Sequence, residues 1–240
     1  MKIEVPGGAR RVLLHSCCAP CCGAITECLQ ENGIEPVIFF SNSNIWPRGE
    51  YELRRDECGR WAAARGVVFV EDEYDHAAWR EAVLGLEGEP ERGRRCSACF
   101  RFRLLRAARY AAASGLTVLT TSLASSRWKN LEQVNAAGEE ACAAAASGLP
   151  TIAPEGITLR KTSFDTVADS PSIAPAQPPV WWPQNWRKGG LQERRGQIIR
   201  EQNFYNQNYC GCEFSLSAQN SCRQEMPIPP TANPSAPEIP

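Results

Sequence analysis

The residue types that could do chemistry in this 240-residue chain are its cysteines, which fall into three close groups. In chain order the groups are Cys17–Cys18 with Cys21–Cys22, Cys96 with Cys99, and Cys210 with Cys212. Adjacent cysteines bridge only through a strained ring, so a disulfide within the first group is disfavoured. Thiolates that converge from two loops can instead hold zinc or an iron–sulfur cluster. The spacing predicts a metal centre and leaves both kinds open.

The CGC group, Cys210 and Cys212, has a different spacing. One intervening glycine lets the two sulfurs meet in a small, strained ring, and strained disulfides are easily reduced. We therefore expect a redox-active pair here. Two further metal ligands, or two inert thiols, are the alternative.

Length and composition favour a protein that keeps its cysteines reduced. A chain of 240 residues can bury a core without disulfides, and its N-terminal apolar run, Val12–Leu14, is too short for a signal peptide. No run approaches the roughly 20 apolar residues of a membrane helix. We expect a cytoplasmic protein without membrane contact. Cys28, Cys58 and Cys142 lie within helix patterns and are expected to be core residues.

Strand and helix patterns alternate along the first part of the chain, which predicts a three-layer α/β domain with a parallel sheet. Strands are expected at 11–16, 36–41, 67–72 and 117–122, and helices at 23–33, 50–66, 75–86, 97–115 and 129–148. Ligands of such sheets collect beyond the carboxyl ends of the strands. The loops HSCCAPCC, SNSNIWP and TSLASSR all follow strands, so they should face one crevice.

The rest of the chain is expected to complete one catalytic domain spanning residues 1–223. Residues 150–183 are rich in Pro, Ser and Thr and are expected to form an insertion or loop. A helix over 191–203 should lead into CGC, so that a C-terminal helical segment closes over the cysteine site. The proline-rich tail, 224–240, is expected to be disordered.

Arginine is concentrated in two stretches, although the net charge is only −1. Seven arginines lie between Arg92 and Arg109, and a second basic stretch begins at Arg187 and Lys188. A solvated helix face is one interpretation. A phosphate-rich partner is the other, because the arginine fork fits phosphate and both stretches adjoin cysteine pairs.

Together these stretches resemble the epoxyqueuosine reductase QueH family. The matching motifs are LLHSCCAPC, SNSNIWPRGEYELR, CSACFRFRL, TTSLASSRWK, NWRKGG and FYNQNYCGCEFS. They run in order from Leu13 to Ser215, interrupted by the proline-rich stretch. The resemblance implies a fold of the HUP, nucleotide-hydrolase-like type. It also implies an enzyme of queuosine biosynthesis that reduces the epoxide of epoxyqueuosine at the tRNA wobble position.

The resemblance also implies roles for individual residues. Its [4Fe–4S] ligands fall on Cys17, Cys18, Cys96 and Cys99, and its redox-active pair on Cys210 and Cys212. Members can carry an additional iron, which we expect near Cys21; the cluster would then have three or four protein ligands. The partners implied are tRNA carrying epoxyqueuosine, whose phosphates would meet Arg101, Arg103, Arg187 and Lys188, and an external electron donor.

Position alone suggests further candidates for binding and for proton transfer. A modified wobble base can be splayed from a single-stranded loop and stacked on aromatic side chains. Candidates for stacking are Trp46, Trp128, Trp186 and Tyr205, and those for the proton donor are Tyr209, Tyr51, Glu50 and Asp56.

Three other functions use the same features. A non-catalytic zinc module that binds nucleic acid would use the cysteines and arginines, but leaves CGC unexplained. A tRNA sulfur-transfer enzyme needs a Gly-rich phosphate loop after the first strand, where HSCCAPCC stands instead. A general thiol–disulfide oxidoreductase would not need the arginines or four further thiols.

Overall fold

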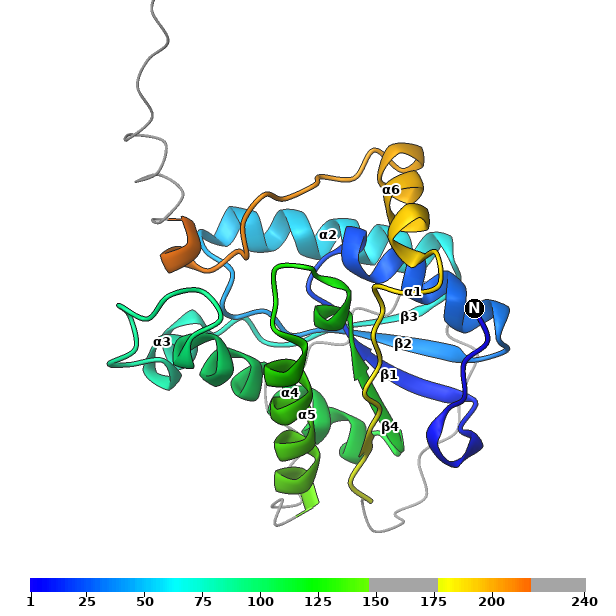
Figure 1. The fold of residues 1–240 in the computed structure, drawn as a ribbon, viewed down its shortest axis with the longest axis horizontal. Helices are drawn as coiled ribbons and strands as arrows, with labels where there is room; N and C mark the ends of the chain where they lie inside the picture. The colour runs from blue at the N-terminus through cyan, green and yellow to red at the C-terminus, as the bar shows by residue number, and fades with distance from the viewer. Residues whose placement is uncertain (147–176, 217–240) are drawn as a thin grey trace, which may run out of the picture.

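A five-stranded parallel sheet forms the centre of the computed structural model, which describes residues 1–146 and 177–216 (Figure 1). The strands are β1 (Arg11–His15), β2 (Glu35–Phe40), β3 (Val68–Glu71), β4 (Val118–Thr121) and β5 (Val180–Trp181). Their order is β3-β2-β1-β4-β5, with every pairing parallel. The order reverses between β1 and β4, as in doubly wound sheets.

Helices cover both faces of this sheet, which confirms the predicted three-layer α/β architecture. They are α1 (Ala19–Glu31), α2 (Arg48–Ala64), α3 (His76–Ala82), α4 (Arg94–Ala113), α5 (Leu131–Ala146) and α6 (Leu191–Glu201), with 3-10 turns η1 (Pro6–Gly8) and η2 (Ser122–Ser125). Figure 1 shows α1, α2 and α6 on one face, and α4 and α5 on the other. None of the helices in the described ranges is long and apolar enough to cross a membrane.

The sheet divides the core in two because successive side chains of a strand point to opposite faces. Leu14 and Ile38 pack with α1 and α2, whereas Leu13 and Val37 pack with α4 and α5. Both faces of β1 are therefore buried in the core, which explains its uninterrupted apolar run. The helix after β1 begins at Ala19, earlier than the predicted residue 23, because Pro20 fits the first turn of a helix.

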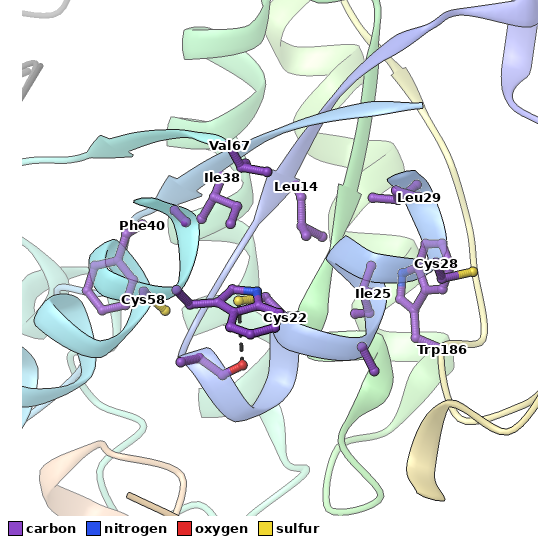
Figure 2. Close-up of a cluster of buried hydrophobic side chains, with 14 of the residues drawn as sticks. Leu14, Cys22, Ile25, Cys28, Leu29, Ile38, Phe40, Cys58, Val67 and Trp186 are labelled. Atoms are coloured by element: carbon purple, nitrogen blue, oxygen red, sulfur yellow. Dashed lines mark hydrogen bonds between the residues drawn. The ribbon is translucent and has the colours of Figure 1, made fainter. Parts of the chain in front are cut away.

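Three cysteines belong to the apolar core under α1 and α2 (Figure 2). Cys22, Cys28 and Cys58 are at most 2% exposed and lie among aliphatic and aromatic side chains. The Cys22 thiol donates to the Ala19 carbonyl oxygen at 3.6 Å. Burial, and then the neighbouring Cys22, raise the pKa of Cys58 well above its usual value. The three thiols pack as small apolar groups.

The short strand β5 was not predicted from the sequence. It lies within the stretch expected to be a loop, and it extends the sheet beside β4. Trp181 is 7% exposed and its indole packs against α5 at Gly138. The remainder of the predicted insertion up to residue 176, and the predicted tail 224–240, lie outside the described residues.

Gly138→Ala is expected to destabilise the domain. An added Cβ would lie 2.3 Å from the Trp181 ring, so helix α5 and strand β5 would have to separate. We expect a loss of about 1–3 kcal/mol in the free energy of unfolding, as for other overpacked cores. Gly59→Ala is the matched control in α2, since its Cβ would meet the Phe69 ring at an ordinary 3.7 Å. Urea unfolding should show that Gly59→Ala is as stable as the wild type or more stable. An equal loss of unfolding free energy in both variants would refute this account of Gly138.

Candidate metal and thiol site

The carboxyl ends of β1 and β4 meet at the point where the strand order reverses, and a cavity of about 860 Å³ opens there. His15 joins these two ends through its Nδ1, 2.8 Å from the Thr121 hydroxyl. Its burial lowers the pKa of the imidazole to about 3, so His15 is a neutral structural residue. The cavity lies at the position that doubly wound sheets use for ligands.

Three cysteines gather at the end of β1. Cys17 and Cys18 follow the strand, and Cys21 lies in the first turn of α1, where Cys18 is the N-cap. The Cys17 and Cys18 sulfurs are 3.8 Å apart, and all three sulfurs lie within 4.8 Å of one another. In the described part of the chain, they are the one group of three or more His, Cys, Asp or Glu side chains this close together. Gln207, from the segment after α6, donates its amide to the Cys18 sulfur at 2.7 Å.

The three thiols differ in how readily they ionise. Hydrogen bonds from Cys18 and Cys21, followed by the charges of Arg103 and Lys129, lower the pKa of Cys17 well below its usual value. Burial raises the pKa of Cys18, and the hydrogen bond to Cys17 raises that of Cys21 to about 12. A metal ion that binds all three sulfurs would therefore have to displace protons from Cys18 and Cys21.

The CxxC pair approaches the same cavity from the start of α4. Cys96 lines the cavity wall, and its sulfur accepts a hydrogen bond from the Arg92 amide at 3.3 Å. Cys99, one turn further on, is 6% exposed and packs in a cluster with Trp79 and Cys212. Burial raises the pKa of both thiols. The structure thus brings Cys96 to the cavity, but groups Cys17 and Cys18 most closely with Cys21.

The CGC pair lines the same cavity, and hydrogen bonds to its backbone hold it in place. The Cys210 carbonyl accepts from the Arg54 guanidinium at 3.2 Å, and the Gly211 carbonyl accepts from the Trp46 amide at 2.8 Å. Gly211 has φ +107°, and an added Cβ would lie 2.9 Å from Arg54. A glycine is therefore required at the centre of this turn.

The two thiols of the pair differ in charge. A hydrogen bond from Cys212, followed by the positive charge of Lys129, lowers the pKa of Cys210 well below its usual value. The same hydrogen bond raises the pKa of Cys212. Cys210 is therefore the thiolate, and Cys212 keeps its proton. Lys129, whose Nζ is 3.2 Å from the Cys210 sulfur, was not singled out from the sequence.

The predicted phosphate-binding residues do not form one patch. Arg103 is 1% exposed and donates to the Ser41 carbonyl at 3.2 Å, so it stabilises the sheet edge and cannot reach a bound phosphate chain. Arg101 pairs with Glu140. Arg187 donates to backbone carbonyls of the loop after β4, while Lys188 is exposed. The charged rim of the cavity is formed by Arg92 and Arg195, which belong to the two arginine-rich stretches, and by Arg127, which lies outside both.

The candidates for stacking and proton transfer are also separated by the fold. Trp128 lines the cavity and is 63% exposed, with the Arg127 guanidinium 4.8 Å from its ring centre. Trp186 is fully buried and is excluded as a stacking partner. Of the predicted proton donors, Tyr209 lines the cavity. The others are engaged elsewhere: Tyr51 bonds Glu71, Glu50 pairs with Arg54, and Asp56 pairs with Arg55.

The donor set fits a metal centre. Cysteine sulfurs are the ligands of zinc and of iron–sulfur clusters, and three of them share this buried corner. A tetrahedral site with metal–sulfur bonds of about 2.3 Å places its sulfurs about 3.8 Å apart, as Cys17 and Cys18 are. A cluster is larger than a single ion, and its remaining ligand can come from Cys96, which lines the same cavity.

A doubly wound α/β domain, with reduced thiols around a cavity at the switch point of its sheet, defines a class of metal-binding or thiol redox proteins. The family model described as "Epoxyqueuosine reductase QueH" matches residues 12–152 and 165–218. Proteins named epoxyqueuosine reductase QueH are 40% identical in Acinetobacter baylyi and 38% identical in Histophilus somni. These alignments cover 94% and 93% of this chain, and 89% and 79% of the relatives. The chain therefore belongs to the QueH family, which confirms the resemblance of its motifs.

Proposed function

We propose that this protein is an epoxyqueuosine reductase, which reduces the epoxide of epoxyqueuosine at the tRNA wobble position with an iron–sulfur cluster and the Cys210–Cys212 pair. The single observation that carries the proposal is that one cavity is lined by both kinds of thiol: two of the Cys17–Cys18–Cys21 group, and the CGC pair. Family membership supplies the reaction, because the relatives are named for it.

The reaction requires two electrons and two protons, since the epoxide oxygen leaves as water. Cys210 and Cys212 can supply the two electrons when they form a disulfide, and they occupy the cavity wall where a substrate would enter. An external electron donor must then reopen the disulfide. The cytoplasm is the compartment we propose, because its thiol pool keeps such cysteines reduced.

The residues proposed to hold the cluster are Cys17, Cys18, Cys96 and Cys99, with an additional iron beside Cys21. When bound, a cluster supplies one-electron transfer, and an iron with an open position supplies Lewis acidity. The chain's own contribution is to bury these sulfurs, with Cys17 at 9% and Cys18 at 1% exposed, and to direct the Gln207 amide at Cys18. Such hydrogen bonds to ligand sulfurs tune the potential of a centre.

The cavity rim offers a place for the anticodon loop. Trp128 presents an exposed indole at the cavity, and Arg127 covers part of it. A base splayed from a single-stranded loop can stack on such a ring, while the rim arginines meet the phosphates on either side. Arg127 and Arg195, which also line the cavity, are the proposed phosphate contacts, because Arg92 donates to the backbone carbonyls of Arg127 and Trp128.

The test uses full-length protein purified without oxygen. Iron, zinc and acid-labile sulfide are measured beside the visible spectrum, and tRNA carrying epoxyqueuosine is then assayed for queuosine by mass spectrometry. We expect about four irons and four sulfides per chain, with a fifth iron if the site beside Cys21 is filled, and conversion of the tRNA. One tightly bound zinc, no sulfide and no conversion would instead establish the zinc-binding nucleic-acid module.

A further inference from the structure

The ion pair between Lys129 and Cys210 places an acidic ammonium group beside a thiol that reacts. We propose that Lys129 is the proton donor: its ammonium pairs with the Cys210 thiolate in the reduced protein, and gives its proton to the epoxide oxygen as Cys210 and Cys212 form a disulfide. The inference rests on the proposed function and deepens it. Its geometric basis is the 3.2 Å contact between Lys129 Nζ and Cys210 Sγ in the cavity wall.

The position of Lys129 is fixed by its backbone. The Arg187 guanidinium donates to the carbonyl oxygens of Ser126 and Lys129, at 2.6 and 2.8 Å. Arg92 donates to the carbonyl of Trp128 at 2.9 Å. Two arginines therefore hold the loop between β4 and α5, so that the lysine side chain enters the cavity beside the thiolate.

The charges around Lys129 explain why its proton is retained until the disulfide forms. Burial opposes the charged form, but the negative charges of Cys210 and then Cys17 outweigh it and raise the pKa of Lys129. The positive charge of Arg103 acts in the opposite direction. Disulfide formation removes the Cys210 charge. The ammonium then lies in a partly buried site with its main partner gone, and becomes a stronger acid.

The step balances in atoms and electrons. The Cys210 thiolate and the Cys212 thiol lose two electrons as their sulfur–sulfur bond forms, and the epoxide gains two as both of its carbon–oxygen bonds break. One proton comes from the Cys212 thiol and the other from the Lys129 ammonium, so the oxygen leaves as water. An external dithiol later reduces the disulfide, and the two protons taken up restore the Cys212 thiol and the Lys129 ammonium.

Other acids of the cavity are less suited to this step. The arginines of the wall do not release protons. Glu91 accepts a hydrogen bond from Ser215, and the Tyr209 hydroxyl donates to the Trp46 carbonyl oxygen at 3.2 Å. Among the described residues of the cavity wall, Lys129 is the one ammonium group, and it touches an atom that reacts.

The test compares Lys129→Arg with Lys129→Met in full-length protein carrying its metal centre. Reduced protein is mixed with equimolar tRNA carrying epoxyqueuosine, without external reductant, and single-turnover formation of queuosine is timed. Arginine keeps the positive charge but holds its proton, so we expect both variants to lose roughly a hundredfold or more in rate. Wild-type turnover by Lys129→Arg would overturn the proposal, because another group would then supply the proton.

Alkylation separates this role from a purely structural one. Iodoacetamide labelling of Cys210 and Cys212 at pH 7 is followed by peptide mass spectrometry, without substrate. We expect Cys210 to react first in the wild type and in Lys129→Arg, and roughly tenfold more slowly in Lys129→Met, whose thiolate has lost its partner. If Cys210 in Lys129→Met is labelled at the wild-type rate, then Lys129 does not stabilise the Cys210 thiolate and the proposal fails. Because labelling needs no tRNA, it tests Lys129 even if the wild type fails to reduce epoxyqueuosine.

Discussion

Replacing Cys210 by serine is expected to abolish the reduction of epoxyqueuosine, by roughly a thousandfold or more in turnover. The hydroxyl of serine neither ionises beside Lys129 nor forms a disulfide with Cys212, so the pair can no longer supply two electrons. The fold should be retained, because the turn is held by backbone contacts of Cys210 and Gly211 to Arg54 and Trp46. Queuosine in the treated tRNA, measured by mass spectrometry, gives the result.

The matched control for Cys210→Ser is Cys142→Ala. Cys142 is a core thiol of α5, 7% exposed, and it does not line the cavity. Its burial raises the pKa to about 12, so it is inert at neutral pH. We expect wild-type turnover from this variant. If Cys210→Ser also reduces epoxyqueuosine at the wild-type rate, then the electrons reach the substrate without the CGC pair, and its proposed role is wrong.

The sheet and its ligand-binding edge were predictable from the sequence because both depend on local patterns. Apolar runs between helices require parallel pairing, and the three loops that follow strands must then meet at one edge. Strand β5 was missed because Val180 and Trp181 are too short a run to show a period. Its pairing with β4 and the packing of Trp181 on Gly138 are tertiary contacts.

The site was predictable at the level of its cysteines, but not at the level of their neighbours. Cys18 and Cys21 are only three positions apart, so their proximity follows from spacing alone. Lys129 meets Cys210 across 81 positions of the chain, through a loop that Arg187 holds from a third segment. Arg103 was wrongly predicted to contact phosphate because it lies in an arginine-rich helix. In the structure it donates to the Ser41 carbonyl at the buried carboxyl end of β2.

Replacing Cys18 by serine is expected to remove the proposed metal centre. Cys18 is 1% exposed at the start of α1, and its sulfur lies 3.8 Å from that of Cys17. An alcohol is a harder and much less acidic donor than a thiol, and iron–sulfur clusters select thiolates. We expect iron and sulfide per chain to fall roughly tenfold or more in anaerobically purified protein. Far-UV circular dichroism should be unchanged.

Cys22→Ser gives this prediction its matched control, because Cys22 lies four residues after Cys18 in the same helix. Its sulfur donates to the Ala19 carbonyl and packs in the core under α1 and α2, away from the cavity (Figure 2). A serine hydroxyl can keep that hydrogen bond, so Cys22→Ser should retain its iron and sulfide. If both variants fold and both lose the metal, the ligand assignment to Cys18 fails. If only Cys18→Ser loses the metal, Cys18 is a metal ligand and Cys22 is a core residue, in agreement with their positions in the structure.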